Sequence, residues 1–168
     1  MEAFSADQIK RQFDTNVIGL LAVTQAIMPL FRKQKAGVLV NISSVGGRMT
    51  FPFFSLYHGT KFAVEGITEA LAWEMGTFGG RAKIVEPGAI KTDFAGRSQE
   101  FVNDPGLEDY QPMIGKLAAG FAQSGANGSE PSVVGRGDFW RGDGWHGPAA
   151  LYGGRGLQGP DGGAQRAG

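Results

Sequence analysis

The sequence contains no cysteine among its 168 residues. This absence excludes disulfide bonds, thiolate catalysis and zinc or iron–sulfur sites built on cysteine. The formal charges also cancel, because 16 Lys and Arg residues face 16 Asp and Glu residues. A chain without net charge gives no electrostatic reason to expect binding to nucleic acid or to an anionic membrane surface.

Long apolar runs and metal-binding patterns are missing as well. No uninterrupted apolar run approaches the ~20 residues that span a bilayer. The residues after Met1 do not have the basic and then apolar pattern of a signal peptide. The two histidines, His58 and His146, lie far apart, and neither has a carboxylate at ligand spacing. We therefore expect a cytoplasmic protein without a metal ion, a nucleic-acid partner or a membrane anchor.

Glycine is abundant instead, and it is unevenly distributed. Of the 28 glycines, 12 fall within residues 135–168, a stretch without Ile, Val, Met, Lys, Glu, Ser, Thr or Asn. A back-translation shifted by one nucleotide turns this tail into a pattern of helix, turn and strand, so we interpret it as a frameshifted C-terminus. The alternative is a natural glycine-rich tail. Both interpretations predict disorder and divide the chain into residues 1–134 and 135–168.

The first part has the alternating pattern of an α/β fold. Ser5 and Gln8 form a capping box that begins a helix reaching about Lys33. Apolar, β-branched strands, a second long helix and two weaker helices then follow. The expected elements are strands at 38–42 and 82–85 and helices at 55–76, 113–123 and from 129 onward. The order helix, strand, helix, strand predicts a parallel sheet with a crossover helix.

Tyr57 and Lys61 stand four residues apart on the second long helix, so they share one face. A free tyrosine has a pKa near ~10, and a lysine cation nearby favours the phenolate. Such a pair can transfer protons at neutral pH. Taken alone, the spacing also fits an ordinary pair on a helix surface.

Three further positions give the Tyr57 and Lys61 pair a context. Ser44 follows the strand 38–42, and Pro87-Gly88 follows the strand 82–85. The carboxyl ends of parallel strands are where ligands bind in open α/β sheets. Asn16 is a poor helix former within the first helix. The alternatives are structural: Ser44 and Pro87-Gly88 form turns, and Asn16 is a buried side chain that bonds backbone.

Together these segments resemble the short-chain dehydrogenase/reductase family over residues 1 to about 134. The resemblance rests on Asn16-Val17-Ile18-Gly19, Val40-Asn41-Ile42-Ser43-Ser44, Tyr57-x-x-x-Lys61 and Pro87-Gly88-x-x-x-Thr92. It implies that Tyr57 is the general acid/base for a carbonyl or alcohol. Lys61 would lower the pKa of Tyr57 and bind the nicotinamide ribose, Ser44 would hydrogen-bond the substrate oxygen, and Asn16 would hold a water in the proton relay.

The same resemblance implies the cofactor, the partners and the fold. The cofactor would be NAD or NADP, with Tyr57, Lys61, Pro87-Gly88, Ile90 and Thr92 at its nicotinamide end. The substrate would be a small carbonyl compound or alcohol, residues 93–128 would form a mobile lid, and the two long helices would pair in homodimers or tetramers. The fold would be the second half of a Rossmann-like, doubly wound parallel sheet.

The sequence departs from the family before Asn16. A dinucleotide site needs a strand, a glycine-rich turn and a helix N-terminus, and the residues before Asn16 belong to the first helix. Glycines in the tail, such as Gly153-Gly154, follow no strand and are rejected as a phosphate loop. Two hypotheses therefore stand: an NAD(P)-dependent oxidoreductase, or a non-catalytic truncated fragment without the dinucleotide-binding half. A third is that a partner chain supplies that half.

Aromatic residues around the Tyr57 motif and in the expected lid leave the substrate open. They indicate either an apolar substrate pocket or simply core packing. The residues are Phe51, Phe53, Phe94, Phe101, Tyr110 and Met113. His58 is expected to lie on the helix surface beside Tyr57, and Trp140, Trp145 and His146 of the tail are expected to carry no function.

Overall fold

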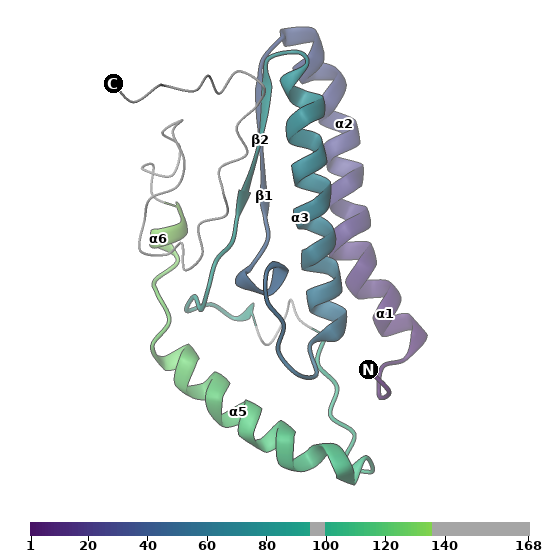
Figure 1. Ribbon diagram of the computed structural model, residues 1–168, viewed down its shortest axis with the longest axis vertical. Coiled ribbons are helices and arrows are strands. Elements are labelled where there is room, and N and C mark those ends of the chain that lie inside the picture. The colour runs from purple at the N-terminus through teal and green to yellow at the C-terminus, as the bar shows by residue number, and fades with distance from the viewer. Residues whose placement is uncertain (95–99, 136–168) are drawn as a thin grey trace, which may run out of the picture.

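The computed structural model describes residues 1–94 and 100–135. The expected disorder of the glycine-rich tail, with Trp140, Trp145 and His146, therefore lies outside the described residues, apart from Gly135. Within the described ranges, helices and strands alternate as the sequence predicts (Figure 1). The elements are α1 (Ala6–Phe13), η1 (Asp14–Ile18), α2 (Gly19–Gln34), β1 (Gly37–Ile42), η2 (Val45–Gly47), α3 (Ser55–Gly76), β2 (Gly80–Val85), η3 (Glu108–Tyr110), α5 (Gln111–Ala126) and α6 (Ser132–Gly135).

The first long helix is continuous from α1 to α2, but one turn is wider than the rest. Ser5 and Gln8 form the predicted capping box, because each side chain bonds the other's backbone. The segment η1 then has π-helical hydrogen bonding, a form that recurs at functional sites. The helix ends at Gln34, and its C-cap residue, Lys35, has a positive φ of 54°. The structure thus confirms the helix and adds a π turn around Asn16.

The two strands are parallel and adjacent, as the sequence predicts. They pair in register from Gly37 with Gly80 to Ile42 with Val85. Helix α3 connects them and packs on the sheet, where Leu71 and Met75 form a small core with Ala82 of β2. Figure 1 shows α2 running alongside α3, so both long helices lie on the same side of the sheet. The described residues contain only this two-stranded sheet.

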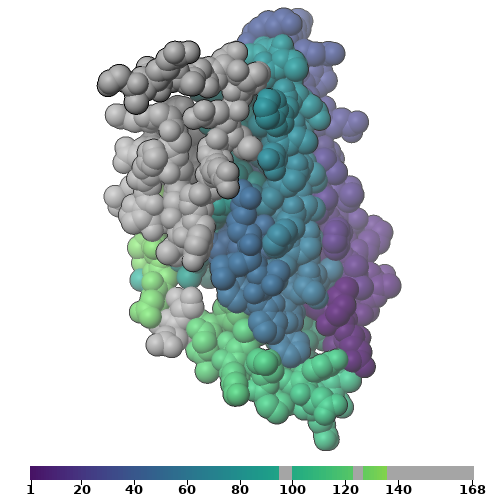
Figure 2. All heavy atoms as spheres, viewed as in Figure 1, coloured from purple at the N-terminus to yellow at the C-terminus, as the bar shows by residue number. Residues whose placement is uncertain are grey.

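Helix α5 crosses near the carboxyl ends of the strands and the start of α3 (Figure 1). It begins two residues before the predicted helix 113–123 and ends three residues after it. The space-filling view shows its surface meeting that of the segment before α3 (Figure 2). The meeting point is aromatic, since the Phe121 ring lies 6.0 Å from Phe51 and 5.0 Å from Phe54. Part of the expected lid, residues 95–99, is outside the described residues.

The first long helix is more apolar than its uninterrupted runs indicate. The helical stretch Ala6–Gln34 is long and apolar enough to cross a membrane by length and mean hydropathy, which reaches 1.3 in its most apolar window. Interruptions by Gly, Thr and Gln hide this property when only uninterrupted apolar runs are counted. Packed helices of water-soluble domains pass the same test, and Met28 and Phe31 of this helix pack against the core that Leu71 and Met75 of α3 form.

Candidate active site

The turns that follow the two strands are tied together at one edge of the sheet. Val45 donates its backbone N–H to the Pro87 carbonyl at 3.1 Å. The Ser44 hydroxyl lies 3.5 Å from the same carbonyl and accepts a hydrogen bond from the Gly46 N–H at 3.0 Å. The two turns therefore lie side by side, as the parallel topology predicts, and Ser44 is held between them.

Tyr57 and Lys61 meet these turns from the first two turns of α3. The Tyr57 side chain is buried, with 8% exposure. Lys61 Nζ donates to the Ile42 carbonyl at 3.0 Å, at the end of β1, and lies 5.7 Å from the centroid of the Tyr57 ring. The lysine thus bridges the phenol and the strand end, and Ser44, Tyr57 and Lys61 share one small region.

The surroundings of Tyr57 and Lys61 act on their acidities in opposite senses. Burial raises the pKa of Tyr57 above 10.0, and a hydrogen bond with Ser44 lowers it. Burial lowers the pKa of Lys61 below 10.5, and the charge of Glu65 opposes this. The phenolate of Tyr57 is therefore favoured by Ser44, while a lowering by Lys61 stays a prediction.

Asn16 reaches α3 from the π turn. Its Nδ2 donates to Thr60 Oγ1 at 3.0 Å, and the Thr60 hydroxyl donates to the Tyr57 carbonyl at 2.7 Å. Thr60 is fully buried. Asn16 therefore bonds a side chain instead of backbone, and it is linked to the turn of helix that carries Tyr57 and Lys61.

The predicted cofactor residues continue from the second turn. Pro87, Gly88 and Ile90 are half-buried, whereas Thr92 is exposed. Ile90 forms an isolated parallel bridge with Ser129, so the segment after β2 is held by the residues that precede α6. Among the described residues, the Lys61 ammonium uses one of its three N–H groups, on Ile42. Donors therefore remain for ribose hydroxyls, and the chemistry of this edge fits a nicotinamide ribose.

The prediction that His58 lies on the helix surface is wrong. Its side chain is 3% exposed, because α3 begins beneath the segment that contains Phe51 and Phe54. Nδ1 lies 2.7 Å from the Gly46 carbonyl, and Nε2 accepts the Phe51 N–H at 2.8 Å. The three phenylalanines directly before the helix, at positions 51, 53 and 54, are the sequence signal that its first turn is covered.

A cluster of charges that the sequence did not reveal lies beside these turns. Arg48 donates from Nε to Glu86 Oε1 at 2.6 Å and pairs with Glu65 Oε2 at 3.1 Å. Both carboxylates are nearly buried. Burial raises the pKa of Glu65, with a further rise from Glu86 and an opposing effect of Arg48. No sequence pattern brings these three residues together, because 17 or more positions separate Arg48 from each acid.

The aromatic residues divide into two groups. Phe94 lies against Tyr57, with 5.4 Å between ring centroids, and Phe101 and Phe121 pack on Phe54. Phe53 instead contacts Tyr110 at 5.6 Å and has a positive φ of 65°. Met113 is 51% exposed. Phe94 thus covers Tyr57, while the rings of Phe54, Phe101 and Phe121 form an aromatic wall at the start of α3.

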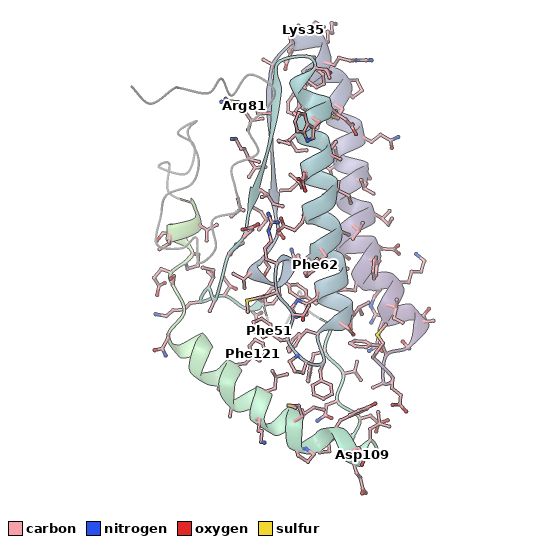
Figure 3. All side chains as sticks on the ribbon, viewed as in Figure 1. Lys35, Phe51, Phe62, Arg81, Asp109 and Phe121 are labelled. Carbon is pink, nitrogen blue, oxygen red and sulfur yellow. The ribbon has the colours of Figure 1, made fainter. Side chains whose placement is uncertain are left out.

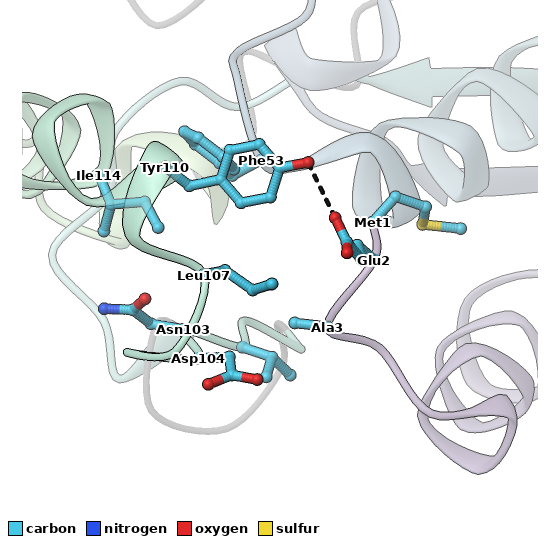
Figure 4. Close-up of a pocket in the computed structure, with 10 residues that line it drawn as sticks. Met1, Glu2, Ala3, Phe53, Asn103, Asp104, Leu107, Tyr110 and Ile114 are labelled. Carbon is cyan, nitrogen blue, oxygen red and sulfur yellow. Dashed lines mark hydrogen bonds between the residues drawn. The ribbon is translucent and has the colours of Figure 1, made fainter.

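The second group borders a hollow near the N-terminus (Figure 4). It lies between Glu2, Phe53, Leu107 and Tyr110, and the Tyr110 hydroxyl donates to Glu2 Oε2 at 3.0 Å. Ser44, Tyr57 and Lys61 do not line it. In the described part of the chain, no three His, Asp or Glu side chains gather as metal ligands would.

Comparison with known proteins identifies the family. Residues 1–103 match the family model of the short chain dehydrogenases. An uncharacterized oxidoreductase of Schizosaccharomyces pombe is 44% identical over 122 residues, which are 70% of this chain and 52% of the relative. The chain thus spans about half the length of that curated relative.

Solved structures agree with the fold. ElxO with NADP bound has a TM-score of 0.53 at 30% identity, covering 57% of this chain and 41% of that one. A 3-oxoacyl-[acyl-carrier protein] reductase with bound NAD from Brucella melitensis has a TM-score of 0.53 at 30% identity, covering 58% and 38%. The layer of α2 and α3 packed on the parallel strands is therefore part of a Rossmann-like fold. The chain belongs to the short-chain dehydrogenase family of oxidoreductases.

Proposed function

We propose that the edge formed by Ser44, Tyr57 and Lys61 interconverts a carbonyl and an alcohol in an NAD(P)-dependent oxidoreductase. The observation that carries this proposal is the convergence of a buried phenol, a serine hydroxyl and an ammonium at the carboxyl end of β1. Solved relatives with NADP or NAD bound support the cofactor class. A reduced nicotinamide, when bound, supplies the hydride.

The protein's own residues handle the proton and the orientation. Ser44 donates a hydrogen bond to the substrate oxygen, and the Tyr57 hydroxyl gives its proton to that oxygen as the C–H bond forms. Lys61 stabilises the resulting phenolate by its charge. Asn16, held by Thr60, places a water from which Tyr57 regains its proton. In the oxidative direction each proton moves the opposite way.

A second function has a specific observation in its favour. The chain spans about half of its curated relative, and the described sheet has two strands. Two parallel strands do not make the open sheet on which dinucleotides bind. The second candidate is therefore a non-catalytic fragment that lacks the dinucleotide-binding half.

A fluorescence titration of the protein with NADH and NADPH separates the two candidates. Saturable enhancement that Lys61→Met weakens supports the enzyme. Absence of saturable binding by both cofactors supports the fragment. Glu69→Gln is a matched control, because Glu69 is an exposed residue of the same helix.

We further propose that copies of the protein pair through the two long helices. Apolar side chains are exposed on both of them, with Val23 at 67%, Phe62 at 47% and Trp73 at 57%. Figure 3 labels Phe62 on α3. Sedimentation equilibrium should show a dimer that Phe62→Glu or Trp73→Glu weakens, and a monomer at every concentration would contradict the pairing.

A further inference from the structure

The residue after Tyr57 makes two hydrogen bonds that fix its chemical state. The Phe51 backbone N–H can only donate, so His58 Nε2 must accept it at 2.8 Å. A neutral imidazole then carries its proton on Nδ1, which donates to the Gly46 carbonyl at 2.7 Å. Both ring nitrogens are thus committed to backbone groups, and the ring is neutral in a single tautomer.

One of these bonds leads to Ser44. The Gly46 peptide is held at both ends, since its carbonyl accepts from His58 and its N–H donates to Ser44 Oγ at 3.0 Å. The Gly46 N–H occupies an acceptor position of the hydroxyl, and the Ser44 proton points toward the Pro87 carbonyl, 3.5 Å away. The packing is close, because a Cβ on Gly46 would lie 2.9 Å from His58 Nδ1 and 3.1 Å from the Tyr57 ring.

The other bond leads to the aromatic wall. Phe51, whose N–H is held by Nε2, has its ring 5.6 Å from the His58 ring and 6.0 Å from Phe121 of α5. Figure 3 shows the labelled Phe51 and Phe121 close together between α3 and α5. The Phe54 ring lies 6.3 Å from His58 on another side. One imidazole therefore connects the Ser44 turn with the aromatic wall between α3 and α5.

We propose that His58 is a positioning residue of the active site, whose neutral ring fixes the Ser44 turn and the Phe51 segment relative to Tyr57. The proposal rests on the function proposed for Tyr57 and Ser44. His58 acts through backbone groups and does not touch the reacting atoms. Nδ1 holds the Ser44 turn through the Gly46 carbonyl, and Nε2 holds the Phe51 segment through the Phe51 N–H.

Two substitutions separate these contributions. In His58→Asn the side-chain amide takes the place of Nδ1 and keeps the bond to Gly46. In His58→Gln the amide oxygen reaches the place of Nε2 and keeps the bond to Phe51. Thr68→Val is the matched control. Thr68 lies on the same helix, away from Tyr57, and its hydroxyl accepts a buried hydrogen bond of 2.8 Å from Asn41 of β1.

Nuclear magnetic resonance of the full chain gives readouts that need no cofactor. The ¹⁵N shifts of His58 should show a neutral ring protonated on Nδ1. The pKa of Tyr57, followed at ¹³Cζ, should rise by about half a unit or more in His58→Gln, because Ser44 then holds the phenol less well. It should stay unchanged in His58→Asn and in Thr68→Val. The Phe51 amide should exchange faster only in His58→Asn.

Several results would overturn the proposal. A His58 ring that is protonated on Nε2 in the wild-type protein contradicts the proposal. This test needs no variant, so it holds even if a variant does not fold. An equal shift of the Tyr57 pKa in Thr68→Val, or no shift in His58→Gln, reduces His58 to ordinary packing. Failure of the proposed function would instead appear as absent cofactor binding, which leaves these readouts intact.

Discussion

Arg48 Nε lies 2.6 Å from Glu86 Oε1 and so joins the turn after β1 to the turn after β2. The same guanidinium reaches Glu65 on α3 at 3.1 Å. Three elements that carry Ser44, Pro87 and Lys61 therefore meet through one cation. The cluster therefore links the elements on which the proposed active-site residues lie.

Removing the cation should destabilise the fold in a pH-dependent way. Arg48→Ala leaves Glu65 and Glu86 buried side by side without a cation. We expect the free energy of unfolding at pH 7 to fall by about 1–3 kcal/mol. This is less than for a fully buried ion pair, because Arg48 is half exposed. The folded-state pKa of Glu65 is raised above 4.5. Stability is therefore lost as pH rises through the interval above 4.5, and Arg48→Ala widens that interval.

Urea unfolding at pH 7 and pH 4 measures this effect. The difference between wild type and Arg48→Ala should shrink at pH 4, because the raised pKa of Glu65 favours the uncharged form of that carboxyl there. Arg81→Ala, an exposed arginine on β2, serves as the control and should change stability by less than about 0.5 kcal/mol. A loss from Arg48→Ala that is equal at both pH values would contradict the account.

Glu65 should also support the protonated state of Lys61. Its charge opposes the lowering of the Lys61 pKa by burial. In Glu65→Gln we expect the pKa of Lys61 to fall further below 10.5, as followed by the ¹³Cε resonance. Glu69→Gln, one turn further along α3, should leave it in place. An equal fall in both variants would mean that the effect is one of overall charge.

Asn16 and Thr60 should be energetically coupled. Their hydrogen bond of 3.0 Å joins the π turn to α3, with Thr60 fully buried. A double-mutant cycle of Asn16→Ala and Thr60→Val should give a coupling free energy of about 1 kcal/mol in urea unfolding. Additive effects would show that the bond contributes nothing to holding Asn16.

Two glycines should respond oppositely to alanine. A Cβ on Gly47 would lie 2.6 Å from Ser43 Oγ and 2.8 Å from Glu65 Oε1, whereas nothing lies within 4 Å of a Cβ on Gly66. We expect Gly47→Ala to cost about 1–3 kcal/mol and Gly66→Ala, on the exposed side of α3, to gain about 0.5–1 kcal/mol. Thermal unfolding of both variants checks this, and a stable Gly47→Ala would refute the close packing.

The sequence predicts those parts of the molecule that depend on neighbours in the chain. The capping box of Ser5, both strands and α3 follow from local patterns. Ser44 and Pro87 meet because parallel strands end at one edge. His58 and Arg48 could not be placed in this way. The partners of His58 are backbone groups of a turn and a loop, and those of Arg48 are distant acids.

The direction of the Tyr57 pKa shift also depends on residues that the local sequence pattern does not place. A lysine four residues on suggests a lowering, but the start of α3 is covered by aromatic residues, and burial raises the pKa. Desolvation depends on what folds over a group, which spacing alone does not reveal.

The most direct test of the active-site assignment is an activity measurement on the chain joined to the part of the Schizosaccharomyces pombe relative that lies outside the matched segment. Oxidation of NADPH or NADH is followed with a panel of small aldehydes and ketones, for wild type and Tyr57→Phe. The account predicts carbonyl-dependent oxidation that Tyr57→Phe reduces by about 10²-fold or more, with cofactor binding retained. Equal rates in the two proteins would contradict the role of Tyr57.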